Sequence, residues 1–327
     1  MSTVAQSSLH DRAVRIVGRR AHRPLASRLD YASTYATALL TSGCSLAAFH
    51  LAHRHLGETG FAEFAIIRRA VAVLAPLLSL GMAVAIAKGV ACRSATLRAA
   101  DAVQFLSAGA AVTMLSLSTF ALAVFLFPEQ ASLLCTGSPQ RANLVLNLAP
   151  LVGGLVLTMC CGAYWRGRMQ IRAVNALQLT CVGVIPAVVL LCVDNVESFL
   201  LWSGYAVTTV SGLAILVVSV KSPRAIRRVP YRDVQWLLRF GAPRTPGDLA
   251  FYGLLAAPAI VASHQAGLQR GGEVAYALAL LTMLQQLVAP LSTLLLPEAA
   301  YLIHSSVMAL GRLMSPNRMG GLTQREP

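Results

Sequence analysis

The chain has 327 residues, of which 56% are hydrophobic and only 12% are charged, and its mean hydropathy is +0.63. A soluble domain carries about 25% charged residues, so this composition excludes an ordinary soluble enzyme. The net charge of +14 comes from 27 Lys and Arg against 13 Asp and Glu. The apolar fraction argues against a nucleic-acid-binding protein, and basic loops beside a bilayer explain the charge better.

Eight apolar stretches follow one another along the chain. A helix needs about 20 apolar residues to cross the hydrocarbon core of a bilayer. The tail before the first stretch is polar and Arg-rich, and the first stretch is long, so we expect an uncleaved signal anchor rather than a signal peptide. We expect transmembrane helices at residues 31–51, 61–87, 103–127, 144–164, 174–193, 198–220, 247–267 and 275–297.

Positive charges alternate between the loops that join these stretches. The two tails and every second loop hold 22 of the 27 Lys and Arg, whereas the opposite loops hold only Arg54, Arg141 and Arg270. The other two, Arg68 and Arg69, lie inside the second stretch. Because Lys and Arg are enriched in cytoplasmic loops, this pattern predicts eight helices with both termini in the cytoplasm.

Three segments carry a family pattern, and the third is followed by a related stretch at residues 274–300. Residues 55–91 contain a Leu-Gly turn, Gly-Phe, a helix and a second Leu-Gly, and residues 148–179 contain an aromatic-Arg-Gly turn. Residues 237–254 contain a Phe-Gly-x-Pro turn, and a Leu-x-Pro closes residues 274–300. In order and spacing, the chain from about residue 30 to 300 resembles the O-antigen and exopolysaccharide flippases of the multidrug, oligosaccharidyl-lipid and polysaccharide exporter superfamily.

The resemblance implies an all-α polytopic membrane bundle of about eight helices, shortened in its second half. Residues 31–220 would form one complete six-helix repeat, and residues 221–303 a basic cytoplasmic loop with the first two helices of a second. GFAEFA at 60–65 is similar to GEVAYA at 272–277, which indicates that the seventh and eighth helices restart the pattern. Residues 1–30 and 304–327 would be cytoplasmic tails.

The resemblance also implies a function. It is the translocation of a polyprenyl-diphosphate-linked oligosaccharide across the bacterial inner membrane for surface polysaccharide biosynthesis. The partners would be that lipid-linked oligosaccharide, membrane lipids, and either polysaccharide polymerase and assembly proteins or a second copy of the chain. The alternatives are a cation-coupled small-molecule antiporter of the same superfamily and a truncated, non-transporting membrane protein associated with polysaccharide assembly.

Arginine is the side chain best suited to an anionic headgroup, since its planar guanidinium forms paired hydrogen bonds with phosphate. A charge inside the bilayer is costly and usually faces a cavity or a partner, so Arg68 and Arg69 are the candidate headgroup ligands. The alternative is that both lie near the outer interface and extend into it. Arg166 and Arg168 are interpreted as determinants of topology rather than of binding.

Four amides are further candidates for a polar cavity. They are Asn175 and Gln178, about one turn apart in the fifth helix, and Gln285 and Gln286 in the eighth. Each could contact sugar hydroxyls or hydrogen-bond a neighbouring helix. No carboxylate falls in the core of the first six helices, which favours an anionic substrate over a cationic one.

Motifs for catalysis and metal binding are missing from the sequence. It has no HExxH, GxSxG or phosphate-binding loop, so we expect a protein that is not an enzyme. The seven Cys have no CxxC spacing, and we interpret them as small apolar packing residues. The sequence predicts no metal site and no cofactor.

Overall fold

The computed structural model describes residues 28–94, 99–220 and 231–286, and every regular element in these ranges is a helix. The predicted all-α class is therefore confirmed for the described residues. Most of the predicted basic tail and loop, the end of the eighth predicted helix and the C-terminal tail lie outside them. Residues 33–287 belong to one compact unit.

The first element, α2 (Arg28–Ser79), contains a reversal of the chain at Gly57, whose backbone is not helical (φ 70°, ψ −175°). A nitrogen of Arg68, Nη2, donates a hydrogen bond of 2.9 Å to Ser45 Oγ. In a straight helix two residues this far apart in sequence would be separated by about 35 Å. The helix therefore folds back at Gly57 into a first arm (28–56) and a second arm (58–79). Glycine adopts this positive φ without a steric penalty.

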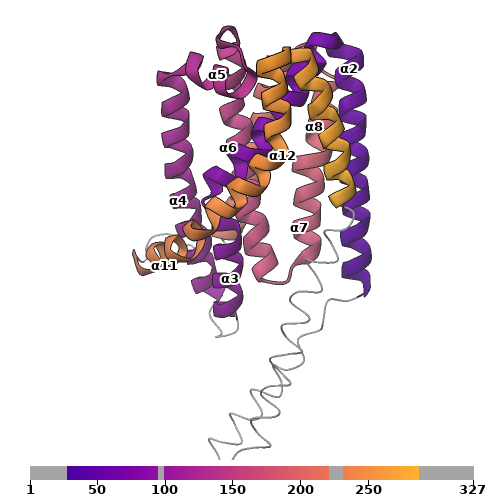
Figure 1. Ribbon diagram of the computed structural model, residues 1–327. Coiled ribbons are helices and arrows are strands. Elements are labelled where there is room, and N and C mark those ends of the chain that lie inside the picture. Colours follow the sequence, from indigo (N-terminus) through magenta and orange to yellow (C-terminus); the bar gives the residue numbers. More distant parts are fainter. Residues whose placement is uncertain (1–27, 95–98, 221–230, 287–327) are drawn as a thin grey trace, which may run out of the picture. The chain divides into compact units, whose positions relative to one another are not determined.

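The long helices after α2 run up and down, with the short α5 across one end and α11 across the bundle toward the other (Figure 1). We name these ends the α5 end, which includes the reversal at Gly57 because Glu63 pairs there with Arg141, and the α11 end. After α2 come α3 (Met82–Ser94), α4 (Ala99–Leu126), α5 (Pro128–Thr136), η1 (Pro139–Arg141), α6 (Ala142–Gly167), α7 (Ile171–Gln178), η2 (Leu179–Val184), α8 (Ile185–Leu190), α9 (Val196–Val220), α11 (Tyr231–Gly241), η3 (Ala242–Arg244), α12 (Thr245–Ala266) and a last helical segment at residues 268–286.

Several of these helices are long and apolar enough to cross a membrane. Five qualify within the described residues, and the bent pair α2 and α3, at 47° to each other, makes a sixth if it counts as one span. The five are Ala102–Leu126, Pro139–Gly167, Ile171–Leu190, Val196–Val220 and Tyr231–Ala266. The expectation of a membrane-embedded helical protein is thus met.

Small residues bring α6 and α9 into close contact. A Cβ on Gly204 would lie 2.6 Å from the backbone nitrogen of Leu151, and a Cβ on Gly154 would lie 2.8 Å from that of Thr208. Glycine at such positions lets membrane helices approach closely, where lipid provides no hydrophobic force between them. Buried side chains of α6 and α9 belong to the larger core, to which α2, the region from α7 to α8, α12 and residues 268–286 also contribute.

The last helical segment packs on α2. A Cβ on Gly272 would lie 2.6 Å from the Cα of Ala62, and the ring of Tyr276 lies 5.1 Å from that of Phe49, centroid to centroid. The described part of the predicted second half is therefore packed against the first half.

A second, smaller core joins α11 to α3, α4 and α6. It is built around buried side chains that include Met82, Ile86, Phe105, Tyr164 and Leu237. The chain enters α3 through a sharp break at Leu80 (φ 47°) and Gly81 (φ 68°). The sequence predicted one continuous helix over 61–87, whereas the structure bends it here.

Replacing Gly81 by Ala tests this break. The new Cβ would lie 2.3 Å from the carbonyl oxygen of Gly241 at the end of α11. A side chain in the left-handed region costs about 1–2 kcal/mol, and the clash adds to that cost. The thermal unfolding midpoint of the detergent-purified protein should therefore fall by several degrees.

Gly212→Ala in α9 is the matched control, because its Cβ meets nothing within 4 Å. Alanine is favoured over glycine in helices, so this change should be neutral or slightly stabilising. Equal midpoints for the two variants would contradict the contact between Gly81 and Gly241.

Candidate functional site

A cavity of about 330 Å³ lies among the second arm of α2, α3, α6, α7 and η2. Its size is at the lower end of the range for ligand pockets. Most of its wall is aliphatic. The lining residues are Val71, Ala72, Ala75, Ala83, Leu155, Thr158, Met159, Gly162, Arg166, Val174, Leu177, Gln178 and Val182.

Two polar side chains of the wall are available to a ligand. Thr158 is already engaged, since its Oγ1 donates to Gly154 O at 2.8 Å and lies 2.7 Å from Ser211 Oγ. Arg166, in the last turn of α6, and Gln178, at the end of α7, are both exposed. The cavity thus offers one permanent positive charge and one amide in apolar surroundings, a combination that attracts an anion with hydrogen-bonding groups.

Two walls of the cavity contain irregular helix. The π-helical segment η2 contributes Val182, and at its end the N–H of Ile185 donates to Thr180 O, five residues back. The break at Leu80 and Gly81 separates Ala75 from Ala83, which line the cavity on either side of it. Such π segments are often found at functional sites.

Arg68, a predicted headgroup ligand, does not line this cavity. It connects the two arms of α2, because its Nη2 donates to Ser45 Oγ and its guanidinium carbon lies 4.9 Å from the ring centroid of Phe49 and 5.6 Å from that of Phe64. Its Nη1 is buried and has no hydrogen-bond partner within the described part of the chain. In this position the guanidinium stabilises the hairpin.

Arg69, the second predicted headgroup ligand, also lies outside the cavity and joins α2 to residues 268–286. It is buried, and its Nε and Nη2 each donate to Ala275 O at 3.2 Å, while Nη2 also lies 3.5 Å from Thr282 Oγ1. All these contacts bridge segments more than 200 residues apart in sequence. The cost of a charge in the membrane is thus offset by backbone and hydroxyl oxygens.

The four candidate amides have different surroundings. The buried Asn175 donates from Nδ2 to Ser33 Oγ and Thr34 Oγ1, both at 3.2 Å, which is the interhelical role left open by the sequence. Gln178 lines the cavity. Gln285 and Gln286 are exposed near the end of the described chain and do not line it.

Arg166 is the cavity residue that sequence reasoning assigned to topology. The signal that could have identified it is the aromatic-Arg-Gly turn, Trp165-Arg166-Gly167. A Cβ on Gly167 would lie 2.6 Å from Ala87 O, so glycine here lets the end of α6 approach α3 closely. This approach sets Arg166 between the helices that enclose the cavity.

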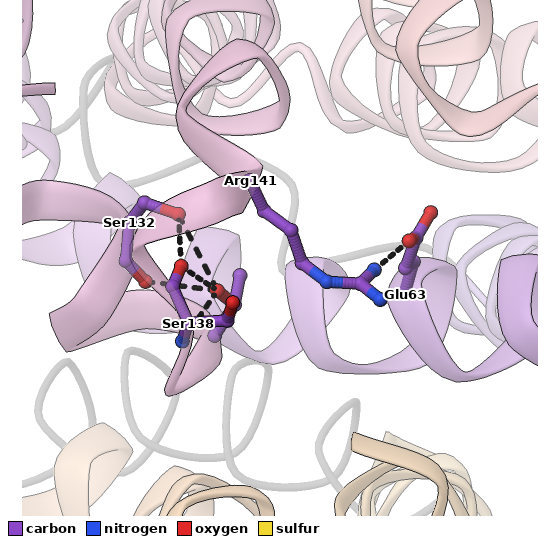
Figure 2. A network of polar contacts seen from close by, with 5 residues as sticks. Glu63, Ser132, Ser138 and Arg141 are labelled. Carbon is purple, nitrogen blue, oxygen red and sulfur yellow. Dashed lines mark hydrogen bonds and ion pairs between the residues drawn. The ribbon is translucent and has the colours of Figure 1, made fainter. Parts of the chain in front are cut away.

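The α5 end is closed by a polar network (Figure 2). Arg141, at the start of α6, forms an ion pair with Glu63 of the second arm of α2. Beside it, Ser132 Oγ and Thr136 Oγ1 donate to Ser138 O at 2.7 and 3.2 Å, which orders the turn after α5. The network ties the α5–α6 connection to the hairpin.

Comparison with known proteins found no match: no protein-family model, no curated protein and no solved structure is significantly similar to the chain. Among the described residues, no group of three or more His, Cys, Asp or Glu side chains could hold a metal ion. The chemistry that can be assigned is that of Arg166 and Gln178 in the cavity.

Arg69→Ala tests the bridge to residues 268–286. A hydrogen bond to a charged group contributes about 1.5–3 kcal/mol, so the variant should unfold at a clearly lower temperature in detergent. Arg69→Lys should recover only part of the loss, because an ammonium lacks the guanidinium fork.

Arg54→Ala, an exposed arginine in the first arm of α2, is the control and should leave the unfolding temperature unchanged. An Arg69→Ala protein as stable as wild type would show that the contacts to Ala275 and Thr282 do not hold the two segments together.

Proposed function

We propose that the chain is a membrane transporter that moves a polyprenyl-diphosphate-linked oligosaccharide across the bacterial inner membrane for surface polysaccharide assembly. The observation that carries the proposal is the cavity enclosed by α2, α3, α6, α7 and η2, in which Arg166 and Gln178 are the available polar groups. The family pattern of the sequence supports a substrate for polysaccharide assembly, and the charge of the cavity supports a substrate with an anionic headgroup.

The proposed topology has eight crossings with the α11 end in the cytoplasm. The reversal at Gly57 supports two crossings within α2, since each arm exceeds the roughly 20 residues needed. Charge supports the orientation. At the α11 end the described, exposed cations are Lys88, Arg166, Arg168, Arg172, Arg232, Arg239 and Arg244. The described cations of the α5 end are Arg54, Arg141 and Arg270, and they lie among the acids Glu58, Glu63, Glu129, Asp194, Glu197 and Glu273.

The sign of the cavity charge favours an anion over a cationic drug. None of the lining residues is Asp or Glu, whereas Arg166 is permanently charged. A cation-coupled antiporter for cationic drugs would place an acid where Arg166 stands. The cavity supports a phosphate-bearing ligand, the class that guanidinium recognises best.

The size of the cavity limits how much of the headgroup it would hold. At about 330 Å³, it would enclose the compact anionic part of a lipid-linked oligosaccharide and leave further sugars outside. The polyprenyl tail would stay in the bilayer. The breaks at Leu80–Gly81 and in η2 are the positions at which the walls could rearrange while the packed seam between α6 and α9 stays fixed.

Arg166→Ala tests the proposal. Cells that lack the chain are given the wild-type or the variant gene, and both the lipid-linked oligosaccharide and the surface polysaccharide are quantified. Loss of a charge-assisted contact worth about 1.5–3 kcal/mol should reduce the rate of surface polysaccharide formation about tenfold or more. The lipid-linked precursor should accumulate at an unchanged protein level.

Arg172→Ala is the matched control, because Arg172 is an exposed arginine at the same end and does not line the cavity. It should restore export fully. If Arg166→Ala also restores full export, the cavity is not the path of the headgroup. If deletion of the chain changes neither the amount of lipid-linked oligosaccharide nor that of surface polysaccharide, the chain is not the transporter of this oligosaccharide.

A further inference from the structure

The combined length of α11, η3 and α12 exceeds the thickness of the membrane's hydrocarbon core, which places α11 at the membrane surface. Together α11, η3 and α12 span Tyr231–Ala266, or 36 residues, which is about 54 Å of helix. The hydrocarbon core is only about 30 Å thick. The 22 residues of α12 already cover about 33 Å, so α11 lies beyond the hydrocarbon, at the level of the headgroups.

The inner face of α11 is fixed to the bundle. Asp233, Leu237 and Gly241 are buried on it, and the helix packs against α3 and α4. The ring of Trp236 stacks on that of Phe240 at 5.5 Å and meets that of Phe105 edge-on at 5.4 Å. These contacts hold the helix in one orientation, so its outer face is defined.

The outer face of α11 is cationic and aromatic. Arg232 and Arg239 are both exposed, and seven residues of helix bring them back to the same side, about 10 Å apart along the axis. Tyr231, 78% exposed, and Trp236, 37% exposed, flank them. Tyrosine and tryptophan of this kind are enriched where protein meets headgroups.

No exposed acid balances these arginines within α11. Its one carboxylate, Asp233, is buried on the inner face. Asp248 follows in the first turn of α12 and is half-buried. A further cation stands beside the aromatic stack, since Lys88 Nζ of α3 lies 4.1 Å from the ring centroid of Phe240.

We infer that the outer face of α11 is a binding site for the headgroups of anionic phospholipids, with Arg232 and Arg239 as the phosphate ligands. Guanidinium forms paired hydrogen bonds with phosphate, and basic amphipathic helices at the interface bind anionic lipids by the sum of charge and buried apolar area. The site is separate from the cavity and is independent of what the chain transports.

The helix that carries this site also contacts the wall of the cavity. The last residue of α11, Gly241, contacts the break that leads into α3, because a Cβ on Gly241 would lie 2.8 Å from Leu80 O. Ala75 and Ala83, on either side of that break, line the cavity. A lipid that holds α11 in place would therefore also hold this break.

The test compares lipid binding by the purified full chain and by the double variant Arg232→Gln/Arg239→Gln. Each protein in neutral detergent is titrated with phosphatidylglycerol or phosphatidylcholine, and bound lipid is counted by native mass spectrometry. An interfacial cation contributes roughly fivefold to the binding of anionic lipid. The double variant should therefore lose about 30-fold in phosphatidylglycerol affinity and nothing in phosphatidylcholine affinity.

The control is Arg54→Gln/Arg270→Gln, which removes two exposed arginines from the α5 end and should keep wild-type binding. Circular dichroism and the elution volume should be unchanged in both variants, because the substituted arginines are all exposed. Equal phosphatidylglycerol affinity of wild type and the α11 variant would overturn the inference. An equal loss in the control would overturn it too, since net charge alone would then explain binding.

Discussion

The reversal of α2 at Gly57 is the constraint on which the other contacts depend. It turns one long helical stretch into two antiparallel arms and brings Arg68 against Ser45. The second arm then presents Arg69 to residues 268–286 and Val71, Ala72 and Ala75 to the cavity. Without a residue that tolerates positive φ at this position, neither the hairpin nor the cavity wall could form.

The arginines of the chain illustrate how one side chain type serves three purposes in a membrane. Arg68 and Arg69 are held by oxygens and rings of neighbouring helices, so their charge is used to bind helix to helix. Arg166 lines the cavity, where we propose that its charge binds a ligand. Arg232 and Arg239 are exposed on α11, where we infer that they bind lipid headgroups. Placement relative to the bilayer decides which role each arginine takes.

The sequence predicted the all-helical class, because apolar runs of membrane length are properties of local stretches. Within the described residues five helices, or six with the bent pair, are long and apolar enough to cross a membrane, so the expected number of eight stays a prediction. The sequence also predicted the division of α2 into two arms, because the polar residues 52–60 separate the apolar stretches at 31–51 and 61–87. It could not predict which oxygen Arg69 would meet, since Ala275 is more than 200 residues away. The sequence also could not predict that Arg68 contacts Ser45 or that Arg166 lines the cavity. These surroundings depend on tertiary packing, and nothing in the neighbouring residues distinguishes one arginine from another.

The most direct test of this account is the side of the membrane on which the two turns lie. Thr59, just after the reversal at Gly57, and Met169, in the turn between α6 and α7, are replaced singly by Cys after the seven native cysteines have been changed to Ser. Intact cells are then treated with a membrane-impermeant maleimide. The account predicts that Thr59→Cys is labelled from outside and that Met169→Cys is labelled only after the membrane is opened. Labelling of both positions from the same side would contradict the hairpin topology and, with it, the orientation of the cavity.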